Sequence, residues 1–149
     1  MTKREPTPLR IWLQIAKSSA NLEHSINGKL RENYGQSLSR FDVLSQFIRT
    51  GEDELSVGAL SKELIASSGN ISRLLDRMQK DGLIVRKHSD KDRRSVYIRI
   101  TKSGHKLFAA MASDHHDWIT KMLAGLPHNK QAKLSELLKD LQTVLEDRP

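Results

Sequence analysis

The spacing of apolar residues changes between residues 70 and 101, and this change restricts the folds open to the chain. Up to Gly82 they recur every three or four positions, which predicts a helix with one buried stripe. The stripe consists of Ile71, Leu74, Leu75 and Met78. Residues 83–87 and 95–100 are strand-like, with apolar and polar side chains alternating in the second run. We therefore expect a short helix followed by a two-stranded hairpin with a charged tip.

Further helices are predicted on both sides of this segment. Residues 9–33 show helical apolar spacing, and Ser39 and Ser56 are expected to cap the two helices that follow. Thr101 is expected to cap a long helix that Pro127 ends, and a last helix comes after it. The predicted fold class is mainly α, in the order α-α-β-α-α-β-wing-β-α-α.

The basic charge of the chain is concentrated in one segment. Residues 67–106 hold eleven Lys and Arg against four Asp, a balance of +7 (11 − 4), which equals the +7 of the whole chain (25 − 18). The other residues therefore sum to zero. A neutral body with one basic segment, and a calculated pI near 9.8, indicates a polyanion-binding surface for nucleic acid or an anionic membrane face.

Composition argues against several other classes of protein. Without Cys there are no disulfides and no cysteine-based zinc sites. No apolar run approaches the roughly 20 residues of a membrane span, and residues 1–8 lack a secretory pattern, so we expect a cytoplasmic protein without a membrane partner. His115 and His116 lie about 100° apart on a helix, which disfavours a shared metal ion. No Ser-His-Asp arrangement is recognisable, so we expect neither a cofactor nor enzymatic activity.

Two short helices, a tight turn and a hairpin together predict a winged helix-turn-helix, whose second helix enters the major groove of DNA. Arg can bond guanine, Asn can bond adenine, and Ser can reach bases or phosphates. The predicted groove contacts are Ser67, Ser68, Asn70, Ser72, Arg73 and Arg77. At the hairpin tip, Lys91, Arg93 and Arg94 are expected to reach the neighbouring minor groove, with Asp92 holding Arg94 through a salt bridge.

Residues 68–78, 81–84, 92–98 and 100–104 resemble the MarR family of bacterial transcription regulators. Asp92 and Arg94 match the family's Asp-x-Arg wing signature. Thr101 and Gly104 match the Leu-Thr-x-x-Gly motif that follows, in which Ile100 replaces Leu. The resemblance implies a homodimer with dimerisation helices at residues 1–36 and 104–149. Residues 37–103 would form the DNA-binding domain, and each copy would contact one half-site of a pseudo-palindrome in double-stranded DNA.

The resemblance also implies a small-molecule effector, often an aromatic acid, bound between the dimerisation helices and the winged helix. The residues expected at that pocket are Trp12, Tyr34, Phe47 and Met111, with Arg40 or His24 near a carboxylate. An aromatic acyl-CoA thioester is a second effector class, because residues 68–72 are similar to regulators of aromatic-acid catabolism. The function expected is a ligand-responsive repressor.

Two other functions remain open at the level of the sequence. A sequence-tolerant architectural DNA-binding protein would share the basic segment, but it would not need Asn and Ser on the groove face. A winged helix that binds an acidic protein partner would share the fold without binding DNA.

Overall fold

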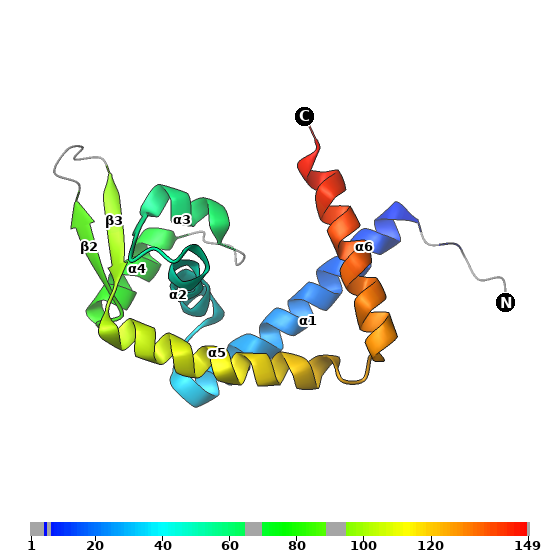
Figure 1. Cartoon of the computed structure of the whole chain (residues 1–149), viewed down its shortest axis with the longest axis horizontal. Helices are drawn as coiled ribbons and strands as arrows, with labels where there is room; N and C mark the ends of the chain where they lie inside the picture. Colours follow the sequence, from blue (N-terminus) through cyan, green and yellow to red (C-terminus); the bar gives the residue numbers. More distant parts are fainter. Residues whose placement is uncertain (1–4, 6, 65–69, 89–94, 149) are drawn as a thin grey trace. The chain divides into compact units, whose positions relative to one another are not determined.

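The computed structural model describes residue 5 and residues 7–64, 70–88 and 95–148 (Figure 1). The chain divides into two compact units, residues 1–112 and 113–149. The elements are α1 (Pro8–Tyr34), α2 (Leu38–Thr50), β1 (Glu54–Ser56), α3 (Val57–Glu63), α4 (Ile71–Lys80), β2 (Ile84–His88), β3 (Val96–Ile100), α5 (Lys102–Leu123) and α6 (His128–Glu146). The predicted fold class and element order are confirmed, whereas the predicted domain limits stay a prediction.

The cap predicted for α2 is wrong by two residues. Ser37, rather than Ser39, precedes the helix, and its hydroxyl oxygen accepts a hydrogen bond of 3.2 Å from the backbone N–H three residues on. Asn27 of α1 accepts the backbone N–H of Leu38 at 2.9 Å, which satisfies the first free donor of α2. This long-range bond fixes the start of α2, and Ser39 lies inside its first turn.

Helix α4 places the predicted apolar stripe against the core. Leu75 and Met78 are fully buried, and Ile71 and Leu74 are half-buried. The helix ends before Gly82, which has the left-handed φ of 76° that favours glycine. Helix α2 contacts α4, and helix α3 contacts strands β1 and β3 (Figure 1).

The sheet has three antiparallel strands in the order β1-β3-β2. Strands β2 and β3 lie side by side in the hairpin (Figure 1). Ile84 pairs with Ile100, and His88 pairs with Val96. The strands predicted at residues 83–87 and 95–100 are thus confirmed to within one residue. Burial follows the predicted alternation in β3, because Ile98 is fully buried and its neighbour Arg99 is exposed.

The core of the first unit gathers apolar side chains from helices and sheet. Its fully buried members include Leu30, Leu44, Phe47, Leu60, Leu75, Met78, Ile84, Ile98 and Met111. Phe41 of α2 stacks on Phe108 of α5 with ring centroids 5.2 Å apart, so that α2 packs against the first half of α5. Among the described residues of α6 none is buried, and no described helix is long and apolar enough to cross a membrane.

A dense junction joins the end of α4, the hairpin and α5. The Thr101 hydroxyl donates to the carbonyl oxygen of Gly82 at 2.6 Å and accepts the backbone N–H of Gly104 at 3.0 Å, as predicted for a helix cap. The backbone N–H of Thr101 also donates to the carbonyl oxygen of Leu83 at 3.1 Å. A Cβ at Gly104 would lie 2.3 Å from that Leu83 oxygen and 2.9 Å from a side-chain carbon of Ile100.

We expect Gly104→Ala to lower the free energy of unfolding by about 1–3 kcal/mol, because the added methyl group meets a backbone oxygen that is already hydrogen-bonded. Urea denaturation at fixed protein concentration measures the change. Gly28→Ala is the matched control, since a Cβ at that position of α1 meets nothing within 4 Å. It should raise stability by about 0.5–1 kcal/mol. Equal effects of the two substitutions would contradict the crowding at Gly104.

Candidate nucleic-acid interface

The exposed face of α4 carries the side chains predicted to contact the major groove. Ser72, Arg73 and Arg77 are exposed, and they leave the helix on the side away from the buried stripe. Asn70 directly precedes the helix. The remaining predicted contacts lie outside the described residues; they are Ser67, Ser68, Lys91, Asp92, Arg93 and Arg94.

Asn70 caps α4 in addition to its predicted role at the DNA. Its side-chain oxygen accepts the backbone N–H of Arg73 at 3.3 Å, and its backbone oxygen accepts the N–H of Leu74 at 3.2 Å. This capping role was not predicted, although an Asn just before an apolar stripe is a common start signal for a helix. The cap places the amide of Asn70 at the N-terminus of α4.

Arg86 of β2 fastens α4 to the hairpin. Its guanidinium makes an ion pair with the carboxylate of Asp76 and donates to the carbonyl oxygen of Ser72 at 2.8 Å. The side-chain oxygen of Gln79 accepts the backbone N–H of Arg86 at 2.7 Å. The negative charge on the exposed face of α4 is therefore compensated. In the sequence, the indication of such an ion pair was Asp76 itself, because it is an acid among the basic residues of the predicted groove face.

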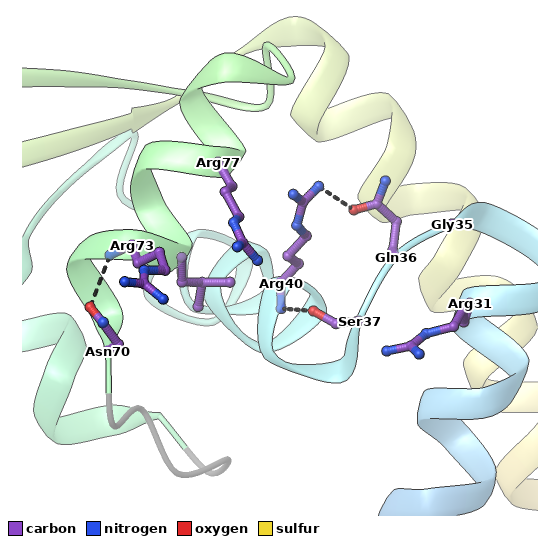
Figure 2. Close-up of a pocket in the computed structure, with 9 residues that line it drawn as sticks. Arg31, Gly35, Gln36, Ser37, Arg40, Asn70, Arg73 and Arg77 are labelled. Atoms are coloured by element: carbon purple, nitrogen blue, oxygen red, sulfur yellow. Dashed lines mark hydrogen bonds between the residues drawn. The ribbon is translucent and has the colours of Figure 1, made fainter.

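A cavity of about 300 Å³ lies where α1 ends and α2 begins, beside α4 (Figure 2). It is lined by Arg31, Gly35, Gln36, Ser37, Arg40, Asn70, Arg73, Leu74 and Arg77. Arg40 donates to the side-chain oxygen of Gln36 at 3.1 Å and to the carboxylate of Asp81 at 2.7 Å. Asp81 follows the last residue of α4, so this ion pair connects the first turn of α2 to the end of α4.

The residues predicted at an effector pocket lie in different surroundings. Phe47 and Met111 belong to the core, whereas the side chain of Trp12 is 60% exposed. The Tyr34 hydroxyl donates to the carbonyl oxygen of Ala110 in α5 at 3.1 Å. Of the six residues named for that pocket, His24 included, Arg40 alone belongs to the described lining of the cavity beside α4. Their shared role in binding an effector stays a prediction.

Within the part of the chain that the structure describes, no group of three or more His, Asp or Glu side chains could hold a metal ion. Burial lowers the pKa of His115 below its ordinary value of 6.5, and the neighbouring His116 lowers it further. The imidazole of His115 is therefore largely neutral near pH 7.

We expect Arg86→Gln to weaken DNA binding by up to about fivefold, the range of an exposed ion pair, because Asp76 would then present an uncompensated charge to the phosphates. Titration of fluorescent DNA measures the effect. Adding Asp76→Asn to this variant removes the repelling charge, and it should recover most of the affinity. If the double variant binds as weakly as Arg86→Gln alone, Arg86 acts at the DNA directly rather than by compensating Asp76.

Comparison with known proteins identifies the same type of domain. A family model described as MarR family matches residues 34–95. An uncharacterised HTH-type transcriptional regulator of Bacillus subtilis, YkoM, is 29% identical over 130 residues, which are 87% of this chain and 80% of YkoM. The solved MarR family regulator from Silicibacter pomeroyi has a TM-score of 0.79 and 26% identity, over 92% of this chain and 94% of that one.

Two further solved structures share the fold at lower identity. Sco3205 from Streptomyces coelicolor, solved in complex with DNA, has a TM-score of 0.77 at 18% identity and covers 94% of this chain and 91% of its own. The organohalide-sensing regulator RdhR-CbdbA1625, solved with 2,4-dichlorophenol, has a TM-score of 0.76 at 19% identity and covers 96% and 88%. Residues 34–95 therefore belong to the MarR family of DNA-binding transcriptional regulators, and the similarity to such regulators extends over most of the chain.

Proposed function

We propose that this regulator is a homodimeric repressor that binds a pseudo-palindromic operator and leaves it when a small aromatic effector binds. The observation that carries the proposal is the exposed face of α4. It presents Arg73 and Arg77 from a helix whose one acid, Asp76, is held in an ion pair. A regulator that binds a neighbouring promoter in this way obstructs transcription, which favours repression.

The groove face is suited to recognising bases as well as phosphates. Arg73 and Arg77 are four residues apart, so they project from the same side of α4. A guanidinium donates two parallel hydrogen bonds to guanine O6 and N7. Ser72, between Asn70 and Arg73, adds a hydroxyl that reaches either a base or a phosphate. We include Ser67, Ser68 and the wing residues Lys91, Asp92, Arg93 and Arg94 in the proposed interface on the basis of the sequence.

Exposed apolar side chains in each unit support the homodimer. In α1 they are Leu9, Ile11, Trp12 and Leu13, which are 44–67% exposed. In α6 they are Leu134, Leu137, Leu138, Val144 and Leu145, which are 41–63% exposed. Clustered exposure of this kind is uncommon in monomers and marks an interaction surface. A second copy of the chain is the simplest partner, and two-fold symmetry matches two operator half-sites about 10 bp apart.

The effector class is inferred from the family and from one relative. The regulator solved with 2,4-dichlorophenol has the same fold, which favours an aromatic effector, as a free acid or a CoA thioester, for this chain. The proposed liners are Trp12, Tyr34, Arg40, Phe47 and Met111. An effector releases the operator only through a differential affinity for the free and the DNA-bound states, typically about 1–3 kcal/mol.

The proposal is tested with the promoter region upstream of the chain's own gene and with random DNA of equal length. A repressor binds its promoter preferentially, and a phenolic acid or its CoA thioester weakens that binding. Equal affinity for both DNAs would indicate an architectural protein. No binding at moderate salt would indicate a winged helix that binds a protein. An affinity that no aromatic compound changes would contradict the effector part of the proposal.

We expect Arg73→Ala to relax the preference for one operator base pair by about 1–3 kcal/mol, because a guanidinium bonded to a base edge discriminates between bases. Binding to a set of operators with single base-pair changes measures it. Arg49→Ala removes the same charge from an exposed residue at the C-terminal end of α2, and it should leave the preference intact. A uniform loss across all operators would place Arg73 at the backbone instead.

We expect Leu137→Asp to weaken dimerisation at least tenfold. Burying a leucine stabilises by about 1.5–3 kcal/mol, and 1.4 kcal/mol corresponds to a factor of ten. Because Leu137 is 55% exposed within one chain, the substitution should leave each copy folded. Sedimentation velocity over a range of concentrations measures the change, and Glu136→Gln, also exposed on α6, is the control. A dimer unaffected by Leu137→Asp would show that α6 lies outside the interface.

A further inference from the structure

The cavity beside α4 is strongly cationic. Four of its lining side chains are arginines, and they come from three helices: Arg31 from α1, Arg40 from α2, and Arg73 and Arg77 from α4 (Figure 2). Among the described residues of its lining, none is acidic. The figure shows Arg31 and Arg77 extending toward the same space from opposite walls. Like charges brought together in this way favour an anion between them.

Within the cavity, one arginine is compensated and the others are not. Arg40 is bound to Asp81 at 2.7 Å, and its side chain is only 15% exposed. Arg31, Arg73 and Arg77 are exposed, and they form no ion pair within 4.0 Å with any acid among the described residues. The α2 N-terminus, capped by Ser37, also borders the cavity, and its helix dipole adds a partial positive charge.

The position of the cavity around α4 indicates the source of the anion. Successive residues lie about 100° apart on a helix. Ser72 and Asp76 therefore share one flank, where Arg86 of the hairpin reaches both of them. Arg73 and Arg77 share the other flank, where they line the cavity. When a helix lies in the major groove, a sugar–phosphate backbone runs along each of its flanks.

We propose that this cavity holds a phosphate group of the DNA backbone when α4 lies in the major groove. The inference rests on the proposed DNA-binding function. It adds Arg31 to the interface and assigns Arg40 to the phosphate rather than to the effector pocket, while Arg73 and Arg77 at the α4 wall keep their proposed base contacts. Of the nine described lining residues only Leu74 is aliphatic, whereas pockets for aromatic ligands are lined mostly by apolar side chains. Arginine at a phosphate positions the protein on the duplex without distinguishing bases.

The experiment compares the salt dependence of DNA binding between wild type, Arg31→Gln and the matched control Arg49→Gln. Each lost phosphate contact lowers the slope of log affinity against log salt by about 0.9. The deficit of Arg31→Gln should therefore shrink about 3.5-fold between 50 and 200 mM salt. Its affinity for operator and for random DNA should fall by the same factor. Arg31→Lys keeps the charge and should restore most of the slope.

The outcomes separate this inference from the proposed function. If wild type lacks a preference for its promoter, the proposed function fails. If wild type shows the preference but Arg31→Gln keeps the slope of Arg49→Gln, the cavity does not hold a DNA phosphate and the inference is overturned. Inorganic phosphate alone supplies a second arm in a thermal-shift titration. Stabilisation of wild type but not of Arg31→Gln, with an unchanged DNA slope, would assign the cavity to a free anion and overturn the inference too.

Discussion

The orientation of α4 depends on ion pairs and hydrogen bonds on both of its flanks. On one flank Arg86 binds the side chain of Asp76 and the backbone of Ser72, and on the other Arg40 binds Asp81. In both ion pairs the carboxylate is exposed to water, which screens the attraction, so these pairs add little stability and their effect is mainly geometric. They also compensate the negative charge of the two acids at α4, which are Asp76 within the helix and Asp81 at its C-cap. The outward face is consequently left with positive charge only, which is the condition for approaching a phosphate backbone.

The junction around Thr101 extends this arrangement beyond α4. The Thr101 hydroxyl and backbone N–H hold the carbonyl oxygens of Gly82 and Leu83, directly after α4, while the same residue starts α5. Gly104 permits the close approach of α5 to Leu83. The start of α5 is therefore joined by hydrogen bonds to the two residues that follow α4 and its cap.

Features that depend on neighbouring residues could be predicted from the sequence, whereas features that depend on distant partners could not. The stripe of α4, the alternation in β3 and the glycine after α4 depend on neighbouring residues, so the periodicity located them. Ser37 and Ser39 are both suitable N-caps. The choice between them depends on Asn27, whose side-chain oxygen accepts the backbone N–H of Leu38, 11 residues away. The partners of Asp76 and Asp81 lie 10 and 41 residues away, where no spacing rule applies. The cavity beside α4 depends on the same long-range contacts, and Arg31 has no local signature.

The discrimination available to a single copy is limited by the length of α4. A helix of ten residues spans about 15 Å and presents few side chains to base edges, each worth about 1–3 kcal/mol of discrimination. Regulators need about 4–10 kcal/mol of preference over non-specific DNA. A dimer doubles the number of base contacts. Once one copy is bound, binding of the other copy to the second half-site becomes an intramolecular step. Under the proposed dimer, the apolar side chains of α1 and α6 therefore govern sequence discrimination as directly as Arg73 does, although they lie outside the proposed DNA contacts.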